Sequence, residues 1–108
     1  MNAFIKLGVI EPLAQVLYQQ GIRIPTVIQQ ASIPAIFKGK DIIGRSETGT
    51  GKTLAYLLPL VQRVDVKKGG TQVLIMTPTR ELAKQIFDVL RPFAILMEAD
   101  VADIIGGR

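Results

Sequence analysis

A chain of 108 residues makes one domain or less, and a hydrophobic fraction of 48% favours a packed globule over a disordered chain. Cysteine and histidine are both absent, which excludes disulfides, zinc sites built on thiolates or imidazoles, and nucleophilic catalysis by Ser-His or Cys-His pairs. Thirteen basic and nine acidic residues give a net charge of +4, which suits a polyanionic partner without establishing one.

The sequence shows neither a secretion signal nor a membrane span. No basic segment followed by an apolar core stands at its start, and the apolar run 54–61 is far too short to span a bilayer. We therefore expect a cytoplasmic or nuclear protein with no membrane contact.

Two helices are predicted in the first part of the chain. Apolar residues recur at helical spacing from Glu11 to Tyr18, with Pro12 in the first turn and Gly21 as the stop signal. A second helical stretch runs from Thr26 to Phe37, and Pro34 is expected to break or kink it.

Three short apolar runs resemble buried parallel strands: 41–45, 72–76 and 101–105. Helical segments separate them, one over 54–61 and one that Thr79 caps. The alternation predicts an α/β fold with a short parallel sheet, in which ligands bind at the carboxyl ends of the strands.

The segment Gly44–Thr53 follows the first predicted strand and leads into a helix, which predicts a phosphate-binding loop. Glycines 49 and 51 let the backbone turn its N–H groups inward, and the helix directs its positive dipole end to the same point. Lys52 would then reach the terminal phosphates of a nucleotide, and the Thr53 hydroxyl would hold Mg²⁺. The expected nucleotide contacts are Ser46, Glu47, Thr48, Gly49, Thr50, Gly51, Lys52 and Thr53.

Several of these motifs have a purely structural alternative. Ser46 stands where the strict phosphate-loop pattern has glycine, so the loop could be an ordinary turn, although such turns do not require Gly-Thr-Gly-Lys-Thr. Thr26 and Gln29 have the spacing of a helix capping box. Thr79 could be only a helix cap, with Arg80 and Glu81 in an internal ion-pair network.

Together these segments resemble the first RecA-like domain of DEAD-box RNA helicases, which are ATP-dependent RNA-remodelling enzymes, over almost the whole chain. Gly21–Gln29 resembles the family's Q motif, with Ile22 in place of the usual phenylalanine, and Phe4 stands where the family has an isolated upstream aromatic. Pro78–Ala83 matches motif Ia without a substitution. The family also accepts serine at position 46.

The resemblance implies a partial RecA-like P-loop NTPase domain of three layers, and the cofactors ATP and Mg²⁺. It implies that the Gln29 amide reads the Hoogsteen edge of adenine with Phe4 packed nearby, which would favour ATP over GTP. It also implies contacts to the RNA backbone that are not sequence-specific. The residues expected to make them are Pro78, Thr79, Arg80, Gly106 and Gly107; the glycine pair could equally be only the end of a strand.

No catalytic residue is expected within residues 1–108, because the family's Asp-Glu-Ala-Asp and Ser-Ala-Thr motifs and its second RecA-like domain are not found there. Met97–Asp100 spells part of the first motif but precedes the glycine pair and has methionine at the magnesium position. We therefore expect the N-terminal portion of a helicase, which binds ATP and RNA and hardly hydrolyses ATP. The alternatives are an isolated binding module or an inert folding fragment. Unpaired apolar strand edges are expected to cause homo-oligomerisation.

Overall fold

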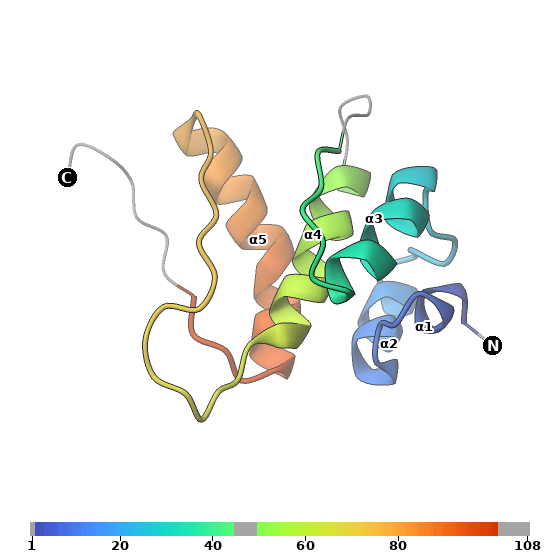
Figure 1. The fold of residues 1–108 in the computed structure, drawn as a ribbon, viewed down its shortest axis with the longest axis horizontal. Helices are drawn as coiled ribbons and strands as arrows, with labels where there is room; N and C mark the ends of the chain where they lie inside the picture. The colour runs from blue at the N-terminus through green and yellow to red at the C-terminus, as the bar shows by residue number, and fades with distance from the viewer. Residues whose placement is uncertain (1, 45–49, 102–108) are drawn as a thin grey trace.

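The computed structural model describes residues 2–44 and 50–101, which form helices joined by extended segments and turns (Figure 1). The helices of this described part are α1 (Ala3–Lys6), α2 (Glu11–Gln19), α3 (Val27–Phe37), α4 (Thr50–Arg63) and α5 (Arg80–Leu96).

Side-chain caps fix where three helices begin. Thr26 and Thr79 precede α3 and α5, as the sequence predicted, and the Thr79 hydroxyl accepts a hydrogen bond from the Leu82 N–H at 3.1 Å. The short helix α1 was not predicted. Its signal is Asn2, whose Oδ1 accepts a hydrogen bond from the Phe4 N–H at 2.7 Å. Local capping chemistry therefore sets these boundaries.

The prolines inside the helices do not end them. Pro34 does not break α3, so of the two expected outcomes only a kink is left, and α4 and α5 likewise continue through Pro59 and Pro92. A proline removes one backbone hydrogen bond and crowds one carbonyl, which is a local cost. The packing of α3 against α4 and of α4 against α5 offsets this cost, since most helical stability in proteins comes from tertiary contacts.

Helix α4 is the centre of the molecule. It packs against α3 on one side and α5 on the other, while α2 contacts α1 and α5 (Figure 1). Apolar side chains from all five helices, and Val9 from the turn after α1, meet in one core. Its buried members are Phe4, Val9, Leu13, Ala14, Leu17, Ile33, Leu54, Leu58, Val61, Phe93 and Ala94.

The predicted parallel sheet is not found in the described residues. Residues 41–44 and 72–76 are present without strand pairing, and so is Val101, whereas 45 and 102–105 lie outside the described part. A strand exists only beside a neighbour about 4.8 Å away that completes its hydrogen-bond ladder. Figure 1 shows the two segments apart, 41–44 beside α3 and α4 and 72–77 along α5, so neither is the other's neighbour. The expected sheet is therefore not supported in this part of the chain.

Residues 72–77 nevertheless keep the alternation of a strand. Val73, Ile75 and Thr77 are half-buried, whereas Leu74 and Met76 are 78% and 84% exposed. Successive side chains therefore point to opposite faces, of which only one is covered by the helices. The alternation expected of a strand is thus present, whereas the described residues do not support the expected pairing.

The turn after α1 requires glycine at position 8 for two reasons. Gly8 has a φ of 109°, which side chains rarely tolerate, and a Cβ there would lie 3.0 Å from the Phe37 ring. We predict that Gly8→Ala lowers the free energy of unfolding by about 2 kcal/mol or more, since backbone strain and overpacking each cost about 1–2 kcal/mol. Urea denaturation followed by circular dichroism measures this.

Two other glycines distinguish the cost of backbone strain from the cost of the contact with the Phe37 ring. Gly21 also has a positive φ, 83°, but open space around it, and Gly69 has open space without a positive φ. Gly21→Ala should cost about 1 kcal/mol, and Gly69→Ala should be neutral or slightly stabilising. Equal losses in Gly8→Ala and Gly21→Ala would show that the contact with Phe37 contributes nothing.

Candidate nucleotide site

The described half of the predicted phosphate loop is the first turn of α4. Thr50 begins the helix, Gly51 follows, and Lys52 and Thr53 are half-buried in the same turn. Ser46, Glu47, Thr48 and Gly49 lie outside the described residues. The first N–H groups of a helix have no partner within it and form its positive end, so this turn is chemically suited to an anion.

Gln29 links this turn to the start of α3. Its Oε1 accepts a hydrogen bond from the Thr26 N–H at 2.9 Å, and its Nε2 donates to the Gly51 carbonyl oxygen at 3.2 Å. Its own N–H donates to the Thr26 hydroxyl at 3.3 Å, which completes the capping box. The side chain is only 2% exposed. The structural alternative noted for Thr26 and Gln29 is therefore present in the fold.

The capping box does not exhaust the Gln29 amide. A side-chain amide can donate two hydrogen bonds and accept two, and the described residues use one of each. Contacts with described residues therefore leave one donor and one acceptor, which is the pair that the N7 and N6 groups of adenine require. The hydrogen-bonding capacity of the amide thus allows both capping and adenine recognition, and adenine recognition stays a prediction that requires the buried amide to become accessible.

The absence of a side chain at Gly51 lets the two helix starts approach. A Cβ at this position would lie 3.3 Å from both the hydroxyl oxygen and the methyl carbon of Thr26. That spacing is tighter than normal van der Waals contact, so a larger residue would push on the side chain that caps α3. This glycine therefore has a packing role in addition to the loop conformation that the sequence suggested.

Phe4 lies elsewhere. Its ring is 0% exposed and belongs to the buried core cluster, which also contains Leu13, Leu17 and Ile33. The structure gives this ring a core role that sequence reasoning did not foresee, because only the tertiary packing reveals it. Contact with adenine stays a prediction that requires the ring to become accessible.

Thr53 offers one hard oxygen for a metal ion. Mg²⁺ takes one or two protein oxygens and completes its shell with phosphates and water, so a lone hydroxyl beside a phosphate loop fits this ion. Among the described residues, no group of three or more His, Cys, Asp or Glu side chains could hold a metal ion. The neighbouring Tyr56 stays a neutral phenol at physiological pH: burial raises its pKa above the ordinary 10.0, and a hydrogen bond with the Thr53 side chain opposes the rise.

The second predicted site lies at the start of α5. Pro78, Thr79 and Arg80 are exposed, and the Thr79 hydroxyl is engaged as the helix cap. Figure 1 shows that α4 and α5 begin at the same, upper side of the molecule. The structure thus brings two predicted segments to one side, while the third, Gly106 and Gly107, lies outside the described residues.

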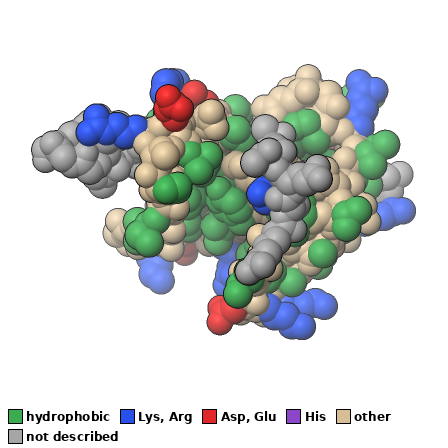
Figure 2. All heavy atoms as spheres, turned by 90° about the horizontal axis from the view of Figure 1, so that it is seen from above, with side chains coloured by type: hydrophobic (Ala, Val, Ile, Leu, Met, Phe, Trp, Pro, Cys, Tyr) green, Lys and Arg blue, Asp and Glu red, His purple; other side chains and the backbone are tan. Residues whose placement is uncertain are grey.

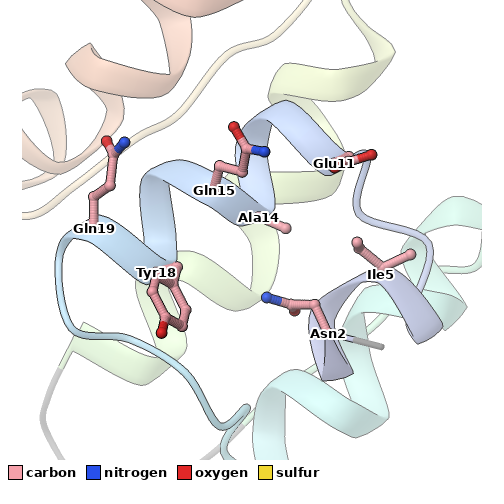
Figure 3. Close-up of a pocket in the computed structure, with 7 residues that line it drawn as sticks. All are labelled: Asn2, Ile5, Glu11, Ala14, Gln15, Tyr18 and Gln19. Atoms are coloured by element: carbon pink, nitrogen blue, oxygen red, sulfur yellow. The ribbon is translucent and has the colours of Figure 1, made fainter.

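A separate depression of about 490 Å³ lies between α1 and α2 (Figure 3). Asn2 and Ile5 line it from α1 and its cap, and Gln15, Tyr18 and Gln19 line it from α2. No predicted site residue contributes to it. Helices of the described part are also too short or too polar to cross a membrane.

The sequence of the chain matches one family of known proteins. The model of the DEAD/DEAH box helicase family matches residues 26–108. The chain is 40% identical to the RNA helicase CrhR of Synechocystis sp. over 107 residues, and 43% identical to the ATP-dependent RNA helicase SrmB of Escherichia coli over 111 aligned positions. Both matches include 99% of this chain.

A solved structure agrees in fold. The RNA helicase Prp28 from Chaetomium thermophilum bound to ADP matches 94% of this chain with a TM-score of 0.83 and 40% identity. The chain spans 26% of that protein and 22% and 25% of the two sequence relatives, so it corresponds to about a quarter of each. From the family match and these identities it follows that the chain belongs to the DEAD/DEAH box helicase family.

Proposed function

We propose that this chain is the ATP-binding and RNA-binding N-terminal part of an ATP-dependent RNA helicase. The observation that carries the proposal is the Gln29 amide, which is buried between the start of α3 and the first turn of α4 and keeps one donor and one acceptor that the described residues do not use. Two relatives also support the proposal. SrmB is named an ATP-dependent RNA helicase, and the structure of Prp28 was solved with ADP bound.

In this proposal the triphosphate binds at the first turn of α4. The helix N–H groups and the Lys52 ammonium group stabilise its negative charge, and the Thr53 hydroxyl holds the Mg²⁺ that neutralises the phosphates. The remaining contacts come from Ser46, Glu47, Thr48, Gly49, Thr50 and Gly51. Gln29 then selects adenine over guanine, since guanine presents an acceptor where adenine presents the N6 donor.

RNA would bind at the start of α5 through its phosphates. The exposed helix start and the Arg80 guanidinium group favour an anion, as Gly106 and Gly107 would by allowing close approach. Such contacts hold the backbone and carry no sequence information. Binding should therefore fall steeply with salt and vary little with RNA sequence.

Hydrolysis belongs to the whole protein in this proposal. Met97–Asp100 does not supply the missing magnesium motif, because Met97 caps the end of α5 and Glu98 turns the chain with a φ of 58°. Residues 1–108 then bind nucleotide in the cytoplasm or nucleus, and the full-length protein couples ATP hydrolysis to local duplex opening.

Adenine recognition by Gln29 can be separated from its capping role. We predict that Gln29→Ala loses most of the preference for ATP over GTP, a preference of about 1–3 kcal/mol if base-pair edge values transfer. Thr26→Ala removes the capping hydroxyl, at about 1 kcal/mol of stability, and leaves the amide in place. Isothermal titration of both nucleotides against the three proteins measures the preference.

The Thr26→Ala variant is the control that separates base recognition by the Gln29 amide from helix capping. Equal loss of the preference in Thr26→Ala and Gln29→Ala would mean that the cap, not the amide, positions the base. Lys52→Ala should weaken ATP and GTP alike by removing a phosphate contact. Equal, weak binding by every protein would leave the inert-fragment alternative.

The role of Thr53 is tested by the metal. Thr53→Val keeps the shape of the side chain and removes the hydroxyl, so it should lose most of the affinity that Mg²⁺ adds to ATP binding, with metal-free ATP affinity unchanged. Thr53→Ser keeps the hydroxyl and should retain the effect. Titrations with Mg²⁺ and with a chelator give the two affinities. A Mg²⁺ effect that survives in Thr53→Val would remove this residue from the metal site.

A further inference from the structure

The first turn of α3 lies beside the chain at both ends of the predicted phosphate loop. At the α4 end, the Gln29 Nε2 donates to the Gly51 carbonyl oxygen at 3.2 Å, and a Cβ at Gly51 would lie 3.3 Å from the Thr26 side chain. At the other end, a Cβ at Gly44 would lie 3.4 Å from the Ile28 Cδ1 and 3.9 Å from its Cγ1. One helix turn therefore meets both the start of the loop segment and the first turn of α4.

The chain reaches Gly44 by running back from the end of α3. The Lys40 N–H donates to the Ala35 carbonyl oxygen at 3.2 Å and so fixes the turn after the helix. Figure 1 shows the segment that follows, 41–44, beside α3 and α4. Among the described residues, no backbone hydrogen bond holds this segment. The position of Gly44 therefore depends on side-chain contacts such as that with Ile28.

Ile28 is not a core side chain. It is half-buried and belongs neither to the core cluster nor to the apolar residues packed against that cluster. The nearby Ile24 and Val27 are 82% and 84% exposed, and Figure 2 shows hydrophobic side chains on the side of the molecule where α4 begins. Of these three side chains, only that of Ile28 comes within 4 Å of a Cβ at Gly44. Its contact therefore bears on the position of Gly44 and not on the core.

We propose that Ile28 is a positioning residue for phosphate binding. Its side chain supports Gly44 while Thr26 and Gln29 of the same turn hold Gly51, so α3 sets the separation of the two ends of the loop segment. A site binds well only when the residues that support it hold its groups in the productive geometry. The inference rests on the proposed function, and adds to it a residue that acts through the main chain and touches no ligand.

The phosphate and the base should respond differently to the loss of this contact. Ile28 supports only the backbone beside the phosphate turn, whereas the Gln29 amide would read the base. A weaker Ile28 contact should therefore lower the affinity for every triphosphate by the same factor. Tripolyphosphate is the suitable probe, because it has the phosphates of ATP and no base. The ratio of the ATP and GTP affinities then reports separately on Gln29.

Ile28→Val removes the Cδ1 atom, which is the Ile28 atom nearest to a Cβ at Gly44. We predict that this variant binds Mg-tripolyphosphate and Mg-ATP more weakly by one common factor, about two- to tenfold, with the ratio of the ATP and GTP affinities unchanged. Isothermal titration measures these affinities. Ile36→Val is the matched control, because Ile36 lies in the last turn of α3 and is also half-buried and outside the core cluster. This control should bind tripolyphosphate like the wild type.

A methyl group added at position 44 tests the contact itself. The Cβ of Gly44→Ala would lie 3.9 Å from the Ile28 Cγ1, an atom that valine keeps. Gly44 does not have a positive φ, so its backbone can accept alanine. Ile28→Val combined with Gly44→Ala should therefore regain most of the lost affinity. Gly44→Ala alone should bind like the wild type, because its Cβ meets the Ile28 Cδ1 at an ordinary contact distance.

The results separate this inference from the proposed function. Equal binding of tripolyphosphate by the wild type, Ile28→Val and Ile36→Val would overturn the inference alone. So would a double variant as weak as Ile28→Val, because the loss would then not come from the contact with Gly44, or a changed ratio of the ATP and GTP affinities, because Ile28 would then act through Gln29. A folded wild type, checked by circular dichroism, that binds neither ATP nor tripolyphosphate would overturn the proposed function and the inference with it.

Discussion

The arrangement of the proposed nucleotide site depends on the two hydrogen bonds of the Gln29 side chain. One amide joins the Thr26 N–H at the start of α3 to the Gly51 carbonyl oxygen in the first turn of α4. Because the amide is buried, losing either bond would leave a polar group unsatisfied, at a cost of about 1–3 kcal/mol. The distance between the two helix starts is thereby fixed, and Gly51 has no side chain to prevent the approach.

The same contact connects fold and function. Helix α4 carries the phosphate turn at one end and the buried side chains Leu54, Leu58 and Val61 along its length, so the turn is anchored in the core. Gln29 holds its side-chain amide at a set position relative to that turn, and in the proposed function this amide reads the base. A protein that binds the phosphates in this way would also position adenine, because one side chain contacts the starts of both helices.

The features that could be predicted from the sequence are those that depend on residues close together in the chain. Thr26 and Thr79 as helix caps, and the stop after α2 near Gly21, follow from groups within a few residues, and the structure confirms them. The phosphate loop was predicted from the sequence because its residue types are tied to one kind of ligand. Only part of that loop is among the described residues, so its contacts remain predictions.

What the sequence missed depends on distant parts of the chain. Pro34 was expected to break or kink α3, and the helix, which packs on α4, is not broken there. Residues 72–77 alternate like a strand and still form none in the described part, because pairing requires a neighbour that local sequence cannot supply. Phe4 was assigned to adenine by resemblance, whereas its burial among Leu13 and Leu17 is visible only in three dimensions.

The most direct measurement is the response of the Gln29 side-chain amide to nucleotide, followed by ¹⁵N nuclear magnetic resonance. If Gln29 reads adenine beside the phosphate turn, Mg-ATP will shift the Gln29 NH₂ signals together with the backbone signal of Gly51, and Mg-GTP will shift Gly51 with little change at Gln29. Saturation with Mg-ATP that leaves both signals unmoved would contradict the central claim that these two helix starts form the nucleotide site.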